Sequence, residues 1–364
     1  MAEVFLATIA DDPILRLVAL KRILPEFSDD PEFVRMFLDE VRIAGQLTHP
    51  NLALMHECGQ VEGVYFLTME FVAGVNLRVL VRRGHPAPQE IVATIGAGVA
   101  GALDHAHTLV DQRGESLGLV HRDVTPHNVM VSFDGEEKLL DFGIAKARTR
   151  AERTRSGVLK GKYAYMVPEQ IRGQELDHRA DVFSLGAVLY EAFTGVRPFS
   201  GSNPMEILRH VTECAPASPR TIRYDLAPEL DAIVLRALAR DPGMRFQSGG
   251  ELEEALRQFL ADRGKVYLPQ ELASYAKELF PERHKAVQGV AQEVERIKGR
   301  LQRRSGSLEL PPAPPPARGP PPPPPMGAHP APQADTAPPP GGHKEDHSKP
   351  PARIGSPTRG PREK

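Results

Sequence analysis

Cysteine is scarce in this sequence, and long apolar runs are missing from it. Two cysteines, Cys58 and Cys214, among 364 residues argue against a disulfide framework and suit a reducing compartment. The nearest candidate for a membrane span, 91–103, falls short of the ~18 apolar residues that a spanning helix needs and runs into Asp104, which predicts a buried helix instead. We therefore expect no membrane span, no signal peptide and a cytoplasmic location.

The chain also carries almost no net charge. Lys and Arg number 45 and Asp and Glu 47, which gives a formal net charge of -2. Such a chain has no overall attraction to nucleic acid or to an acidic membrane, and we expect neither as a partner. Its 41% of hydrophobic residues can build the core of one large two-lobed domain or of two ordinary domains.

Proline is abundant but unevenly distributed. Of the 36 prolines, 20 lie from Pro311 onward. A segment of this composition cannot bury enough apolar surface to offset its ordering entropy, so residues 306–364 are predicted to be a disordered tail with polyproline II character. Residues 311–340 could dock a proline-motif-binding partner, or the tail could simply be solvated, and composition carries no sign of a partner.

Residues 263–305 are predicted to be a helical extension. A helical stretch at 251–260 precedes it, and 268–280 reads as a further helix. Apolar residues then recur at alternating three- and four-residue spacing, which is the heptad period: Val287, Val290, Val294, Ile297 and Leu301. Two heptads fit either a helix packed on its own domain or a coiled-coil homodimer, and both interpretations stay open.

The rest of the chain divides into two parts of different character. Residues 1–72 are strand-like, beginning with a strand at 4–10, and contain one strong helix at 31–46, whereas residues 73–262 are mainly helical. This pattern predicts two lobes, a small strand-rich lobe and a larger helical lobe, with a ligand-binding cleft between them.

The chemistry is concentrated in the stretch HRDVTPHN at 121–128 and in Asp141, Phe142 and Gly143. A short hairpin, 129–140, turning at Asp134, should bring Asp141 back beside the first stretch. Two aspartates and an asparagine at one site suit phosphoryl transfer, which needs Mg²⁺ to neutralise phosphate charge and a carboxylate to take the proton of the attacking hydroxyl.

On these motifs, which occur in the expected order, residues 1–262 resemble the bacterial eukaryotic-like serine/threonine protein kinases. The resemblance implies an α+β, two-lobed kinase fold, with a small antiparallel β-sheet N-lobe at 1–72 and a larger helical C-lobe at 73–262. It implies ATP and Mg²⁺ as cofactors and proteins as substrates. Lys21 would hold the nucleotide phosphates, paired with Glu40, Asp123 would be the catalytic base, and the metal ligands would be Asn128 and Asp141.

The resemblance also implies roles in binding and in structural support. The adenine would bind at the hinge, where Met69 is the gatekeeper, and the further nucleotide contacts are expected from Val4, Ala19, Glu70 and Val72. Asp181 would brace the catalytic loop from a buried helix. Glu169, at the end of the activation segment, would pair with Arg245.

Two positions depart from the family pattern. Thr125 stands where these kinases carry a lysine, and Lys162 stands where they carry a threonine. We hypothesise an exchange, in which Lys162 reaches toward Asp123 and the transferred phosphate while Thr125 supplies the hydroxyl contact. An exposed lysine on a flexible segment is the alternative. His127 replaces an acidic residue found in many relatives, so a preference for basic substrates cannot be assumed.

The activation segment is strongly basic. Glu152 opposes a group of seven cations: Lys146, Arg148, Arg150, Arg153, Arg155, Lys160 and Lys162. Phosphate on Thr149, Thr154 or Ser156 would add ~1.5 to 2 negative charges and could order the segment, so we expect autophosphorylation there. A merely solvated basic loop is the alternative.

The glycine-rich phosphate loop of the family is represented here only by its end. Ala2 stands in place of the third glycine, and the first two glycines are not in the sequence. Losing their backbone contacts to phosphate would cost ~3 to 6 kcal/mol, or roughly two to four decades of ATP affinity. Either the product begins upstream of Met1, or the chain is an impaired kinase that acts as a scaffold. The presence of Lys21, Asp123, Asn128 and Asp141 together favours the first explanation.

Overall fold

The computed structural model describes residues 2–11, 14–83, 86–141, 162–264 and 269–305. All of its elements belong to one compact unit, Met1–Glu309. The basic activation segment, except for Lys162, and the proline-rich tail lie outside the described residues. Predictions about those two segments therefore stay predictions.

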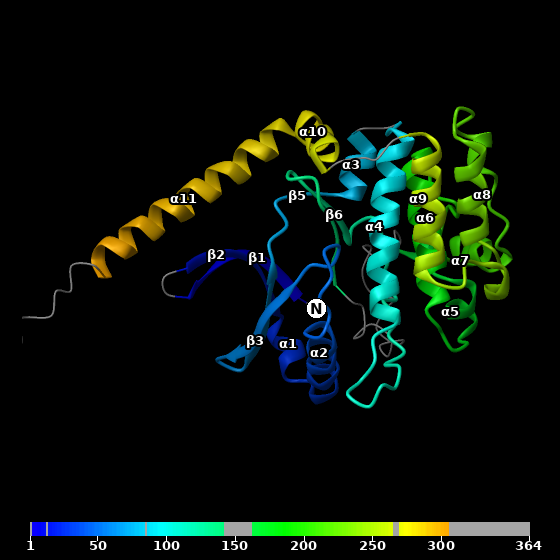
Figure 1. The fold of residues 1–364 in the computed structure, drawn as a ribbon. Coiled ribbons are helices and arrows are strands. Elements are labelled where there is room, and N and C mark those ends of the chain that lie inside the picture. Colours follow the sequence, from blue (N-terminus) through cyan, green and yellow to red (C-terminus); the bar gives the residue numbers. More distant parts are fainter. Residues whose placement is uncertain (1, 12–13, 84–85, 142–161, 265–268, 306–364) are drawn as a thin grey trace, which may run out of the picture. The chain divides into compact units, whose positions relative to one another are not determined.

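The first strands form an antiparallel sheet in the order β1-β2-β4-β3 (Figure 1). Its members are β1 (Ala2–Asp11), β2 (Ile14–Ile23), β3 (Met55–Val61) and β4 (Val64–Glu70). The β3–β4 hairpin turns at Glu62 and Gly63, whose φ angles of 51° and 80° are those of the turn that matches strand twist. Register places Lys21 of β2 between Val4 and Leu67. The strand expected at 4–10 is confirmed.

Two helices accompany this sheet: α1 (Pro25–Ser28) and α2 (Pro31–Ala44). The start of α2 is fixed by Asp30, whose side chain accepts hydrogen bonds from the backbone N–H groups of Glu32 and Phe33. One face of α2 is apolar and builds a small core with strand residues, which comprises Ile23, Phe33, Met36, Phe37, Val41 and Leu67. The predicted helix at 31–46 is confirmed to within two residues.

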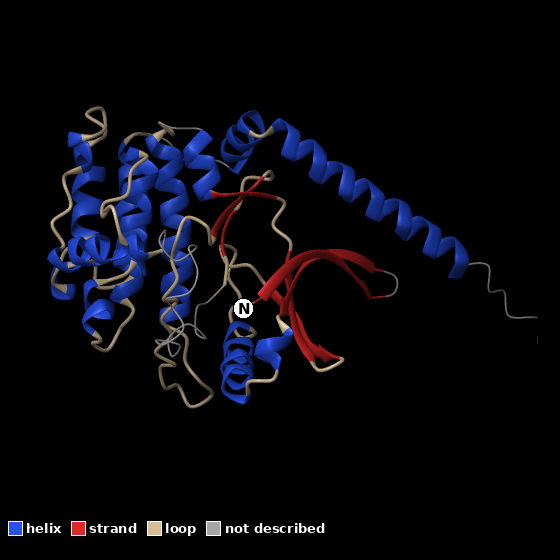
Figure 2. Cartoon of the chain, turned by 180° about the vertical axis from the view of Figure 1, so that it is seen from behind, coloured by secondary structure: helices blue, strands red, loops and turns tan. Residues whose placement is uncertain are grey.

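A second, three-stranded sheet has the order β5-β6-β7, and the two groups of strands are separate in Figure 2. It consists of β5 (Gly74–Asn76), β6 (Val129–Ser132) and β7 (Glu137–Leu139). The predicted hairpin after the catalytic stretch is confirmed as β6 and β7. Gly135 has a φ of 89° in its turn, a conformation that glycine adopts without steric cost.

Helices build the larger core: α3 (Leu77–Arg83), α4 (Gln89–His107), α5 (Pro168–Arg172), α6 (Arg179–Thr194), α7 (Pro204–Glu213), α8 (Pro228–Ala237) and α9 (Gly249–Asp262). Three short 3₁₀ turns connect them: η3 (Tyr163–Tyr165), η4 (Pro219–Thr221) and η5 (Pro242–Met244). Because α4 and α6 are apolar on almost every side, both are buried, and α4 packs against α6 and α9. The buried helix predicted at 91–103 is confirmed within α4.

Two further helices follow: α10 (Pro269–Leu279) and α11 (Pro281–Ser305). α10 packs against α3 and β6, and α11 contacts β2. Along the heptad seam of α11, Val287 packs against the larger core and Val294 is buried, whereas Val290 and Ile297 are exposed. Part of the seam thus packs on its own chain. Across the described segments, every helix is too short or too polar to cross a bilayer.

Candidate active site

The loop that carries Asp123 is held by a buried aspartate of α6. Asp181 accepts hydrogen bonds from the backbone N–H groups of His121 (2.6 Å) and Arg122 (2.8 Å), and its Oδ2 lies 2.8 Å from His107 Nε2. Arg122 has a φ of 63°, a conformation that costs energy for a side chain of this size. The bonds to Asp181 stabilise this bend, so the expected bracing role of Asp181 is confirmed.

Asp123 lies between an ammonium group and an amide. Lys162 Nζ is 3.1 Å from Asp123 Oδ1 and 3.0 Å from Oδ2. Asn128 Nδ2 donates to Oδ2 and to the backbone oxygen of Asp123, both at 2.8 Å. Asp123 is 8% exposed. Its carboxylate is therefore buried, and donors on both oxygens fix its orientation.

Asn128 and Asp141 are linked through the β6–β7 hairpin. The backbone N–H of Leu140 donates to the backbone oxygen of Asn128 at 2.7 Å, which places residue 141 beside the catalytic loop. The amide nitrogen of Asn128 already donates to Asp123, so its Oδ1 is the atom left to accept a ligand. Asp141 has a φ of 48° and turns its carboxylate to Lys21, with Nζ and Oδ1 3.1 Å apart.

Oxygen donors of this kind suit Mg²⁺. That ion is held by one or two carboxylates together with phosphate and water oxygens, and its all-protein ligand set is small. At this site the described residues offer the carboxylate of Asp141 and the amide oxygen of Asn128. Within the described residues there is also no cluster of three His, Cys, Asp or Glu side chains, which is the pattern of a stand-alone metal centre. The donor set therefore fits a metal ion that arrives with a nucleotide.

Thr125 and Glu40 are the other two expected catalytic residues. Thr125 is 3% exposed, and its hydroxyl oxygen has no hydrogen-bond partner among the described residues, so the expected hydroxyl contact is not seen there. Glu40 lies on α2, but its side chain is outside the described part of the structure. Among the described side chains, the carboxylate of Asp141 contacts Lys21, with Oδ1 3.1 Å from Nζ.

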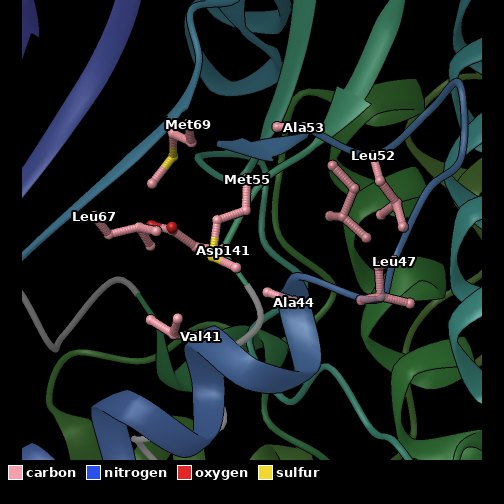
Figure 3. A pocket seen from close by; sticks show the side chains of 10 residues that line it. Val41, Ala44, Leu47, Leu52, Ala53, Met55, Leu67, Met69 and Asp141 are labelled. Atoms are coloured by element: carbon pink, nitrogen blue, oxygen red, sulfur yellow. The ribbon is translucent and has the colours of Figure 1, made fainter. Parts of the chain in front are cut away.

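An apolar cavity lies behind the predicted gatekeeper (Figure 3). Its volume is about 40 Å³, and its lining includes Val41 of α2, Met55, Leu67 and Met69 of the sheet, and Asp141. Ligand pockets usually measure ≈ 300–1,000 Å³. The cavity is therefore much smaller than a ligand pocket, and α2, the sheet and residues 47–53 together enclose it.

The predicted hinge follows β4. The side chain of Glu70 lies 3.0 Å from Lys138 Nζ and accepts a hydrogen bond from the backbone N–H of Leu54 at 3.1 Å. Val72 is buried, and Ala19 pairs with Met69 across the sheet. Since the carboxylate of Glu70 is occupied by protein groups, a base bound at the hinge would use the backbone.

Glu169 and Arg245 form the buried ion pair that the sequence predicts. Arg245 Nη1 lies 2.6 Å from Glu169 Oε1 and Nη2 lies 3.0 Å from Oε2, a bidentate arrangement. The Arg245 side chain is fully buried, and its guanidinium stacks on the ring of Phe183. The pair fixes the start of α5, directly after the turn that follows Lys162.

A second charged network beside the catalytic loop was not predicted. Glu191 of α6 contacts Arg78 Nη1 at 2.5 Å, the hydroxyl of Tyr165, and Arg197 Nε at 3.9 Å. One signal in the sequence could have revealed it. Glu191 is the charged residue of the otherwise largely apolar stretch 185–194, and a buried carboxylate needs partners.

The fold and this constellation define a protein kinase. The family model described as "Protein kinase domain" matches residues 1–260, and the chain belongs to this family. It is 44% identical over 267 residues to the tyrosine-protein kinase MasK of Myxococcus xanthus, covering 72% of this chain and 41% of that protein. It is 38% identical over 264 residues to the serine/threonine-protein kinase PknB of Mycolicibacterium smegmatis, covering 70% of this chain and 40% of that protein.

Solved structures of kinase domains are also similar to this chain. The kinase domain of PknI from M. tuberculosis matches with a TM-score of 0.54 and 32% identity, covering 72% of this chain and 91% of that one. The serine/threonine-protein kinase PknA of Mycobacterium tuberculosis is 36% identical over 266 residues, covering 70% of this chain and 57% of that protein. The chain thus spans between about two fifths and three fifths of the length of these curated relatives.

Proposed function

We propose that this chain is an ATP- and Mg²⁺-dependent protein kinase that transfers the γ-phosphoryl group to serine or threonine hydroxyls of proteins. The observation that carries the proposal is the placement of Asp123 within 3.0 Å of Lys162 and 2.8 Å of Asn128, with Asn128 joined to the hairpin that delivers Asp141 to Lys21. These side chains come from separate parts of the sequence, and phosphoryl transfer uses each type.

The proposed mechanism assigns one task to each group. Lys21 would hold the α- and β-phosphates, with Glu40 expected to support it, while Asn128 Oδ1 and the Asp141 carboxylate would hold Mg²⁺. When bound, Mg²⁺ neutralises charge on the phosphate oxygens. The hydroxyl oxygen of the substrate attacks the γ-phosphorus, and Asp123 accepts the proton of that hydroxyl. The bond between the γ-phosphorus and the bridging oxygen of the β-phosphate breaks. General-base catalysis of this kind contributes typically 10²–10⁴-fold in rate.

The test is transfer of radiolabelled phosphate from γ-labelled ATP to the protein itself and to a general protein substrate. We expect Mg²⁺-dependent labelling that EDTA abolishes, with phosphoserine or phosphothreonine on acid hydrolysis. Both the printed chain and a form extended to the next upstream in-frame start are assayed. Phosphotyrosine alone would overturn the choice of acceptor, which the name of the Myxococcus relative makes worth testing. Absence of transfer in both forms would overturn the kinase proposal and favour a scaffold.

Replacing Lys162 by alanine is expected to lower kcat by about 10- to 100-fold. The reason is that a charge-assisted hydrogen bond, worth about 1.5–3 kcal/mol, is lost at Asp123 and at the transferred phosphate. Lys162→Arg should retain part of the rate because it keeps the charge. The measurement is the steady-state rate at saturating ATP, with Thr125→Ala alongside. Full activity in Lys162→Ala together with an inactive Thr125→Ala would refute the exchange.

Four further parts of the proposal concern the activation segment, the tail, α11 and the location of the protein. Autophosphorylation at Thr149, Thr154 or Ser156 would appear in the same labelling experiment by phosphopeptide mapping. The proline-rich residues 311–340 would recruit a proline-binding partner. The exposed seam residues Val290 and Ile297 leave a homodimer through α11 as part of the proposal, and a cytoplasmic location suits the two unpaired cysteines.

A further inference from the structure

Charged side chains from four separate segments gather beside the catalytic loop. They are Arg78 at the start of α3, His127 in the loop itself, Glu191 in α6, and Arg197 shortly after α6. The backbone N–H of Arg78 donates to the backbone oxygen of Pro126 at 3.0 Å, so α3 is tied directly to the loop between Asp123 and Asn128. A peptide whose hydroxyl reaches Asp123 must pass close to this group.

The group has more positive than negative charge. Among the described residues, Glu191 is the carboxylate that Arg78 and Arg197 contact. Arg78 Nη1 donates to Oε1 at 2.5 Å and the Tyr165 hydroxyl donates to Oε2, so both oxygens of Glu191 already have close donors. One carboxylate therefore faces two guanidinium groups. The pairing of Lys162 with Asp123 does not reduce this excess.

Arg197 is the arginine that remains available. Its Nε lies 3.9 Å from Glu191 Oε1, which is too long for a hydrogen bond. Its side chain is 26% exposed, compared with 15% for Arg78 and 11% for Glu191. Arg78 is thus part of the buried support of the loop, whereas Arg197 presents a guanidinium at the surface. A guanidinium suits bidentate recognition of a carboxylate.

His127 lies within the same positive field. It is exposed on the loop four residues after Asp123. Desolvation by the surrounding atoms, and then the charges of Arg78 and Lys162, lower the pKa of its imidazole. Such a field disfavours a further cation and attracts an anion.

We propose that Arg197 and His127 are specificity-determining residues that select an acidic side chain near the acceptor hydroxyl of the protein substrate. This inference rests on the proposed kinase function and adds the class of substrate. The carboxylate of the substrate binds the guanidinium of Arg197 and accepts a hydrogen bond from His127. A basic side chain at the same place meets an excess of positive charge and is rejected.

The experiment compares three peptides that share one threonine acceptor and differ only in flanking residues, which are Glu, Gln or Lys. We expect the wild-type kcat/KM for the Glu peptide to exceed that for the Gln peptide by about 5- to 10-fold, mainly through KM, with the Lys peptide poorest. In Arg197→Gln the Glu-to-Gln ratio should fall to about one, and in Arg197→Glu the order of the Glu and Lys peptides should reverse.

The matched control is Arg209→Glu, the same charge reversal on the exposed face of α7, where the side chain is 61% exposed. It should leave the peptide ratios as in the wild type. Arg197→Gln removes the charge, keeps a polar side chain and avoids placing a second carboxylate beside Glu191, so it reports on charge rather than on folding. An unchanged ratio in Arg197→Gln, or a wild-type enzyme that prefers the Lys peptide, would overturn the inference. Absence of transfer to every peptide and to the protein itself would instead count against the kinase proposal.

Discussion

Replacing Asp123 by asparagine is expected to lower kcat by about 10²–10⁴-fold, with little change in nucleotide affinity. Asparagine has nearly the same size and can still accept a hydrogen bond from Lys162, which lies 3.0 Å from the carboxylate. Its amide cannot take the proton of an attacking hydroxyl. The loop should keep its conformation, because the bonds that hold it run from Asp181 to the backbone of His121 and Arg122.

The measurement combines initial rates at saturating ATP with a fluorescence titration of nucleotide binding. Asp29→Asn is the matched control, since Asp29 is an exposed aspartate at the end of α1 and the change is the same. It should leave both quantities as in the wild type. If folded Asp123→Asn kept more than a tenth of the wild-type kcat, Asp123 would not be the base. If it instead lost nucleotide binding, the loop would have a structural role that the present geometry does not explain.

Local signals in the sequence were enough to predict most of the elements around this site. Asp30 before Pro31 is a helix start whose capping bonds involve only the next three residues. The β6–β7 turn contains Asp134 and Gly135, and such a turn needs no distant partner. The apolar stretch 91–103 could only be stable as a buried helix. In the first two cases, the interactions that decide the structure lie within a few residues along the chain, and in the third the apolar composition of one stretch was enough to predict burial.

Contacts between distant segments were harder to predict. Lys21 and Asp141 are 3.1 Å apart, and Arg78 meets Glu191 at 2.5 Å, but in neither pair does spacing along the chain imply a contact. Family position suggested that Lys162 approaches Asp123, and the two side chains do lie 3.0 Å apart. The rates of Lys162→Ala and Lys162→Arg test whether Lys162 takes part in catalysis. The contact of α11 with β2 could not be predicted, because two heptads fit a partner helix as well as a strand.

The second large effect is expected when the buried ion pair of Arg245 and Glu169 is broken, and it concerns the stability of the fold. Replacing Arg245 by methionine should lower the free energy of unfolding by about 3–5 kcal/mol, the usual cost of removing one partner from a buried ion pair. Methionine fills similar space but leaves the Glu169 carboxylate buried without its counterion. It also removes the donors to three backbone oxygens, those of Ala239, Arg179 and Arg240.

Urea unfolding followed by circular dichroism measures this change in the free energy of unfolding. The comparison requires that the slope of this free energy against urea concentration is the same in both proteins. Arg209→Met is the control, because its pair with Glu213 is exposed on both sides and such pairs contribute little. The double variant Arg245→Met, Glu169→Leu should recover part of the loss, since it leaves no unpaired charge in the interior. A loss of less than about 1 kcal/mol in Arg245→Met would mean that water reaches Glu169. In that case the pair could not be what fixes the segment between Lys162 and α5, and the position of Lys162 beside Asp123 would need another cause.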